Sequence, residues 1–172
     1  MHEVELRGRL SKDEYLHLKQ RLDRLATGKR NDKKSQFFVF QRGILKVSEH
    51  KQDKKTILSL KLGDETRNNL EELEVTLSLG MFTSAVNLLE RLGYTRRELV
   101  DQQRIDYEID DVGVAIKYTP DWGYHFEVEK MSKSSMSDQR RTREDLLSFC
   151  QTLNIYPMTE EELARFLDSI KR

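Results

Sequence analysis

The sequence is poor in cysteine and proline, and it has neither a net charge nor a long apolar run. Its 172 residues include one cysteine and two prolines. The single cysteine, Cys150, excludes an internal disulfide framework and is typical of a reducing cytoplasm. Because Leu146, Phe149 and Leu153 lie near it at helical spacing, we expect a buried structural thiol.

The lack of a long apolar run and the balanced charge argue against two classes of partner, membranes and nucleic acids. No segment approaches the ~20 apolar residues that a membrane span needs, so we expect no membrane partner. A charged strand pattern begins at residue 3, so we expect no signal peptide and a cytoplasmic location. The 30 basic and 30 acidic residues cancel, which argues against a nucleic-acid partner. The length predicts a single domain over residues 1–172.

Three short segments place glutamates at every second position, with apolar residues between them. These segments are Glu3-Val4-Glu5-Leu6, Glu72-Leu73-Glu74-Val75 and Phe126-Glu127-Val128-Glu129. A period of two is the strand period, so each segment places its carboxylates on one face. Like charges side by side repel unless a cation lies between them. The pattern therefore predicts cations close to these six carboxylates.

The rest of the chain alternates further strand patterns with amphipathic helices. Strand patterns occupy residues 37–40, 44–48, 56–62, 96–100, 102–109 and 112–118, and a basic loop is expected at residues 29–35. Helical patterns cover residues 12–27, 82–92, 138–153 and 159–170. Ser11 with Glu14 and Thr159 with Glu162 predict capping boxes at the first and last of these helices.

Sorting each strand by period two collects the polar side chains on one face of the sheet. Besides the glutamates, this face would hold Arg7, Arg9, Lys46, Ser48, Ser59, Lys61, Gln102, Arg104, Lys117 and His125. If the sheet closes with its helices outside, these charges line an interior that suits a triphosphate with Mg²⁺ or Mn²⁺. An open antiparallel sheet with one wet, charged face fits the same pattern. Periodicity leaves both arrangements open.

The acidic strands also resemble a known family. Glu3-Val4-Glu5-Leu6-Arg7 resembles the N-terminal Glu-x-Glu-x-Lys signature of the CYTH superfamily, the triphosphate tunnel metalloenzymes, with arginine in the lysine position. Further segments resemble the family's later motifs in order, over nearly the whole chain: Ile44 to Ser48, Leu58 to Lys61, Glu72 to Glu74, Leu88 to Tyr94, Gln102 to Arg104 and Trp122 to Glu129.

The resemblance implies an α+β fold, in which a closed antiparallel eight-stranded β-barrel with a charged lumen has helices packed outside. It implies metal-dependent hydrolysis of an inorganic or organic triphosphate with Mg²⁺ or Mn²⁺. The alternatives are a class IV adenylate cyclase that makes cyclic AMP from ATP, and a non-catalytic tunnel that binds polyphosphate or a nucleotide. Such cyclases carry a histidine–phenylalanine pair before the signature, where this chain has only Met1 and His2, so hydrolysis ranks first. The sequence also allows a homodimer.

The resemblance further implies roles for individual residues. It implies that Glu3, Glu5 and Arg7 are catalytic. It implies that the metal is bound by six glutamates, namely Glu3, Glu5, Glu72, Glu74, Glu127 and Glu129. Phosphate binding falls to Arg7, Arg9, Lys46, Lys61, Arg104 and Lys117. The chain departs from the family's pattern at three places, because Ser48 and Gln102 replace basic residues and Lys117 replaces an aspartate.

Overall fold

The computed structural model describes residues 2–62, 71–133 and 135–170. The sequence predicts that the second acidic strand begins at about Leu70, and this residue lies outside the described residues. Over the described ranges the chain forms strands β1 (His2–Arg9), β2 (Lys29–Arg30), β3 (Lys33–Phe38), β4 (Gly43–His50), β5 (Lys55–Leu62), β6 (Glu71–Ser78), β7 (Arg96–Ile109), β8 (Val112–Thr119) and β9 (Gly123–Ser132). The helices are α1 (Lys12–Leu25), α2 (Phe82–Arg91), α3 (Met136–Thr152) and α4 (Glu160–Ile170).

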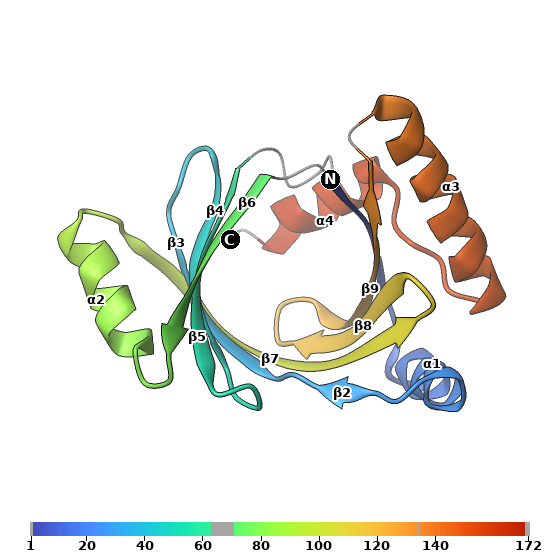
Figure 1. The fold of residues 1–172 in the computed structure, drawn as a ribbon, viewed down its shortest axis with the longest axis horizontal. Coiled ribbons are helices and arrows are strands. Elements are labelled where there is room, and N and C mark those ends of the chain that lie inside the picture. The colour runs from blue at the N-terminus through green and yellow to red at the C-terminus, as the bar shows by residue number, and fades with distance from the viewer. Residues whose placement is uncertain (1, 63–70, 134, 171–172) are drawn as a thin grey trace.

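One antiparallel sheet organises the chain. Eight strands follow the order β1-β9-β8-β7-β3-β4-β5-β6, and the short β2 pairs with β7 beside this path. The sheet curls into a half-barrel with β1 and β6 at its two edges (Figure 1). The predicted α+β fold with eight antiparallel strands is confirmed. The described pairings do not join β1 to β6, so the structure shows a curled half-barrel, and closure into a barrel is not shown.

Strand β7 connects the two halves of the curl. It is one strand of 14 residues, whose first half pairs with β3 and whose second half pairs with β8. The sequence predicts two strands here, interrupted at Asp101, and the structure corrects this. Asp101 is exposed and pairs with Lys51 at 3.1 Å, so it interrupts the apolar pattern without interrupting the backbone ladder.

A second correction concerns residues 29–35, which the sequence predicts as a basic loop. They form β2 and the first half of β3, which pairs with β4 on one side and with β7 on the other. Lys33 and Ser35 line the concave side of the sheet. The segment therefore lacks the apolar alternation by which a half-buried strand is recognised.

Two apolar clusters cover the convex side of the sheet. The larger one joins β1, β8 and β9 to α1 and α3 and includes Leu6, Ile116, Phe126 and Leu146, all at most 1% exposed. The smaller one joins β3, β4 and β5 to α2. Helices α1, α2 and α3 therefore lie outside the curl, as predicted (Figure 1). The apolar faces are buried outside, and the polar faces turn inward.

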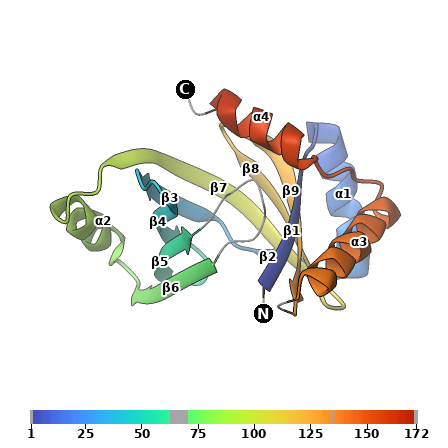
Figure 2. The ribbon, with the colours of Figure 1, turned by 90° about the horizontal axis from the view of Figure 1, so that it is seen from above.

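The predicted helix caps and the predicted buried cysteine are both present in the structure. Both predicted capping boxes form, at Ser11 with Glu14 and at Thr159 with Glu162. Cys150 is 1% exposed, and burial raises the pKa of its thiol to about 12. Helix α4 lies at one end of the curl, beside β1, β8 and β9 (Figure 2). No helix in the described ranges is long and apolar enough to cross a membrane.

Candidate active site

A cavity of about 890 Å³ lies on the concave side of the half-barrel. Every strand of the eight-strand path contributes side chains to it, and α4 adds Leu167 and Ile170. The predicted site residues that line it are Glu3, Glu5, Arg7, Lys46, Lys61, Glu72, Glu74, Arg104, Lys117, Glu127 and Glu129. Arg9 is the exception. It does not line the cavity, and its guanidinium lies 4.7 Å from the ring centroid of Phe166 on α4.

Strand register explains why charged residues from distant segments meet. Glu5 faces Glu129 and Arg7 faces Glu127 across the β1–β9 ladder. Lys117 lies opposite Arg104 on β7. Directly opposed residues of an antiparallel pair share one face of the sheet. The ladder therefore places acidic and basic side chains next to one another on the cavity wall.

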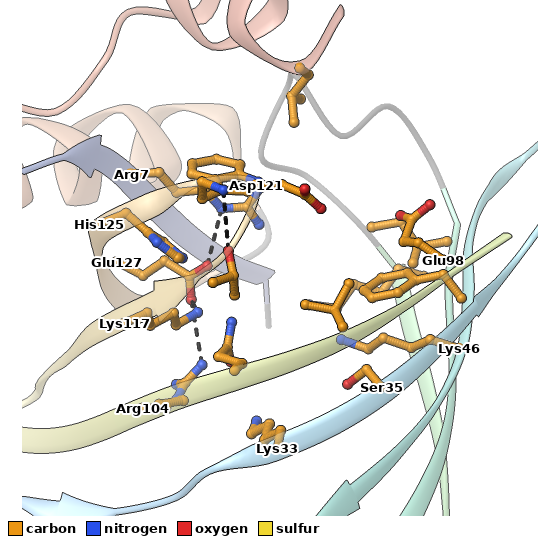
Figure 3. A pocket seen from close by; sticks show the side chains of 18 of the residues that line it. Arg7, Lys33, Ser35, Lys46, Glu98, Arg104, Lys117, Asp121, His125 and Glu127 are labelled. Atoms are coloured by element: carbon orange, nitrogen blue, oxygen red, sulfur yellow. Dashed lines mark hydrogen bonds and ion pairs between the residues drawn. The ribbon is translucent and has the colours of Figure 1, made fainter. Parts of the chain in front are cut away.

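Glu127 is the centre of the most highly charged contact in the cavity. Its carboxylate contacts Lys117 Nζ closely, and Arg7 Nε and Arg104 Nη1 each lie 3.5 Å from one of its oxygens (Figure 3). The three cations come from β8, β1 and β7. The carboxylate of Glu127 therefore lies among three cationic groups that would otherwise repel one another, and it is an ion-pair partner that all three share.

Glu5 is held by the same arginine. Arg7 donates from Nε to Oε1 at 2.6 Å and from Nη2 to Oε2 at 2.9 Å, a bidentate pair. Burial alone would raise the pKa of Glu5, but Arg7 outweighs burial and lowers that pKa to about 2. Glu5 is therefore a carboxylate at any physiological pH, and both its oxygens accept a hydrogen bond.

Lys117 is the most deeply buried cation of the site, at 4% exposure. Burial and the neighbouring Arg104 hold the pKa of its ammonium well below the ordinary value, and Glu5 acts in the opposite direction. Contact with Glu127 also favours the charged ammonium. Lys117 thus lies in close contact with Glu127 inside the cavity wall.

The carboxylate of Glu3, two residues before Glu5 on β1, is less well compensated by nearby cations. Burial and the charge of Glu129 raise the pKa of Glu3, and Lys61 only partly opposes this. Lys61 itself pairs with Glu72 at 3.1 Å. Among the described residues no three carboxylate, histidine or cysteine groups converge into a ready-made metal cluster.

Two lysines lie on the β3–β4 wall of the cavity. Burial lowers the pKa of Lys46 to about 8, and the charge of Lys61 adds to the effect. Burial and Arg104 lower the pKa of Lys33 to about 8 as well. A lowered pKa indicates that the protonated form is poorly compensated. This wall is therefore the basic side of the cavity.

His125 is a neutral, positioned side chain. Its Nδ1–H donates to the Gly123 carbonyl at 2.9 Å, and its ring packs against Trp122 with centroids 4.9 Å apart. Burial, assisted by Lys117, lowers its pKa to about 3. The imidazole is thus in its neutral form at physiological pH, with Nδ1–H held by the Gly123 carbonyl.

Sequence reasoning does not place several other residues in the cavity wall. These are Lys33, Ser35, Phe37, Glu98, Thr119, Asp121 and Trp122. For Lys33, Ser35 and Phe37, the sequence feature that could have revealed a place in the wall is their spacing of two, since alternate residues of a strand share one face. Asp121 and Trp122 lie in a turn, which strand periodicity does not describe.

No protein-family model and no curated protein matches the sequence. Solved structures do match over nearly the whole chain. A conserved hypothetical protein from Pyrococcus furiosus superposes with a TM-score of 0.74 at 22% identity, covering 93% of each chain. A putative adenylate cyclase from Vibrio parahaemolyticus gives a TM-score of 0.69 at 17% identity, over 94% of this chain and 92% of that one.

A third match carries a described activity. A putative adenylyl cyclase from Hippeastrum, reported to have a dominant triphosphatase activity, gives a TM-score of 0.63 at 15% identity. It covers 91% of this chain and 90% of its own. At these identities the matches establish the fold alone. The chain therefore shares its fold with putative adenylate cyclases and with a protein reported to have triphosphatase activity, which agrees with the likeness inferred from the acidic strands.

Proposed function

We propose that this chain hydrolyses an inorganic or organic triphosphate with Mg²⁺ or Mn²⁺ as cofactor. One observation carries the proposal, namely that a single cavity holds poorly compensated charge of both signs on different walls. Burial and Glu129 raise the pKa of Glu3, while burial and Lys61 lower that of Lys46. A hard divalent cation suits the carboxylate oxygens, and phosphate oxygens suit the lysine.

The donor set fits a hard metal ion, because carboxylate oxygens are the ligands that Mg²⁺ and Mn²⁺ prefer. We assign Glu3 and Glu129 as the principal ligands and Glu72 and Glu74, which line the same cavity from β6, as further ligands. Glu5 and Glu127 complete the expected set, although both already accept from cations of the chain. When bound, the ion would neutralise charge that develops on the phosphoryl oxygens.

The basic residues would bind and orient the phosphate chain. We assign Arg7, Lys46, Lys61, Arg104 and Lys117 to its oxygens, and Glu3, Glu5 and Arg7 to the reacting end. Attack of water on the terminal phosphorus forms one P–O bond and breaks the anhydride bond, so orthophosphate and a diphosphate leave. We also propose that the edges β1 and β6 enclose the bound ligand as a tunnel.

A non-catalytic binder is the second candidate, and one observation favours it. Glu127, expected to bind metal, contacts Lys117, Arg7 and Arg104 instead. A carboxylate with three internal cations has little free capacity for a metal ion. Binding of the anion would then remain, while turnover would be lost.

A single assay separates these candidates. The protein is incubated with tripolyphosphate, thiamine triphosphate or ATP, each with Mg²⁺ or Mn²⁺. Release of orthophosphate supports hydrolysis, whereas cyclic AMP with pyrophosphate supports a cyclase. A raised melting temperature without turnover supports the binder. If no triphosphate is turned over or shifts the melting temperature, the proposed function is wrong.

Paired variants locate any activity in the cavity. Glu3→Gln should abolish metal-dependent phosphate release. Glu108→Gln changes an exposed glutamate on β7 that does not line the cavity, so it should retain the wild-type rate. Equal rates in the two variants would remove Glu3 from the mechanism.

A further inference from the structure

The cations of the cavity differ in whether a carboxylate already compensates them. Arg7, Arg104 and Lys117 contact Glu127, and Lys61 pairs with Glu72. Lys33 and Lys46 line the same cavity, yet within the described part of the chain neither forms an ion pair. These two cations without an ion pair therefore lie on the β3–β4 wall, where the more distant Glu72 and Glu74 offset the effect of burial on Lys46 only in part.

Strand register fixes the position of Lys33. On β3 it lies between His50 of β4 and Gln102 of β7, each directly opposite in its ladder. Neither neighbour is an anion. Figure 3 shows Lys33 on the same wall as Lys46 and below Arg104. Besides burial, the charges of Arg104 and Lys46 lower the pKa of Lys33, whereas the carboxylates of Asp106 and Glu74 act in the opposite direction.

Such an arrangement is unfavourable in the empty cavity. Half-buried ammonium groups lose hydration, and here their neighbours add repulsion. A multiply charged anion between them would remove both costs, because its oxygens accept from the ammonium groups and offset their charge. Cations that already contact carboxylates gain less from the same anion.

We propose that Lys33 is a phosphate-binding residue and that Lys33 and Lys46 together form the principal anion site of the cavity. This inference rests on the proposed function, because it assigns where the phosphate chain binds. It also specifies the ligand chemistry, a chain of phosphates long enough to reach these lysines and still approach the acidic wall at Glu3. Orthophosphate alone should bind weakly.

Calorimetric titration with inorganic tripolyphosphate tests this directly. It is done at pH 7 in EDTA without divalent cations, so that the result depends on the lysines and not on a metal ion. Lys33→Met should weaken binding about 10- to 100-fold, the loss expected for a hydrogen bond to a charged group. Lys33→Arg keeps the charge and should stay within a few-fold of wild type.

Lys34→Met is the matched control. Lys34 is the next residue of β3, but its ammonium lies 5.5 Å from the ring centroid of Phe82 on α2, outside the cavity. The control should bind tripolyphosphate as wild type does. Lys33→Met should remain folded, because Lys33 gives up no ion pair on mutation, and a thermal melt of each variant verifies this.

The outcomes separate this inference from the proposed function. If Lys33→Met and Lys34→Met bind tripolyphosphate equally well, Lys33 is not part of the anion site and the inference fails alone. If the wild-type protein does not bind tripolyphosphate with or without metal, the proposed function fails and the inference with it. Binding should also take up protons near pH 8.5 in wild type, and less in Lys33→Met. Equal proton uptake would contradict the assignment.

Discussion

Replacing Glu127 by glutamine should destabilise the protein more than any other single change of a cavity carboxylate. The substitution keeps the size of the side chain and removes its charge. It leaves Lys117, Arg7 and Arg104 next to one another without the carboxylate that separates them. Arg7 keeps Glu5, and Arg104 keeps Asp106, whereas Lys117 loses its ion pair.

The magnitude follows from the burial of the groups involved. The side chains of Lys117 and Glu127 are 5% and 15% exposed. Removing one partner of a buried ion pair costs about 3 to 5 kcal/mol, and the residual exposure of Glu127 favours the lower end. For a chain of this length, a loss of about 3 kcal/mol lowers the melting temperature by about 6 to 12 °C.

Glu129→Gln is the matched control, since Glu129 lies two residues along the same face of β9. Glu129 makes no ion pair with a described residue, and its charge raises the pKa of Glu3. Its removal relieves repulsion, so stability should stay within about 0.5 kcal/mol or increase. Urea unfolding of both variants measures the difference. Equal losses in the two would refute the central role given to Glu127.

Three further predictions concern protonation. The lowered pKa of Glu5 adds stability that is present above pH 4.5 and disappears as pH falls towards about 2, so Glu5→Gln should flatten the stability curve there. An unchanged acid limb would contradict this. The lowered pKa values of Lys33 and Lys46 mean that the unfolded chain binds more protons between pH 8 and 10.5, so the ligand-free protein should gain stability across that window. Lys33→Met should reduce that slope in pH-dependent urea unfolding. The imidazole resonances of His125 should not shift between pH 5 and 8, and a midpoint inside that range would show that the ring is solvated.

The sequence predicts which side chains face the cavity better than it predicts how they pair. A period of two assigns residues to a face, and this places Glu3, Lys46 and Arg104 correctly, because one face of each strand is buried under helices. Arg9 follows the same period, yet it lies near the end of β1 beside α4. At a strand end, the local packing decides where a side chain points.

The ion pairs could not be predicted from local pattern because they depend on strand order. Arg7 meets Glu127 only because β1 pairs with β9, and Lys61 meets Glu72 only because β5 pairs with β6. Alternation carries no information on which strands are neighbours. Lys33 lies in a segment whose polar composition predicts a loop, so local pattern does not place it on a strand.

The negative charges of the paired glutamates are thus compensated in two different ways in the fold. On one side, cations of the chain itself compensate Glu5 and Glu127. On the other, Glu3 has a raised pKa and only partial compensation from Lys61. Among the described residues, repulsion between Glu3 and Glu129 therefore persists at a place where an external cation would relieve it. Metal binding should accordingly depend on Glu3 and Glu129 far more than on Glu5 and Glu127, a division that the six equivalent glutamates of the sequence do not reveal.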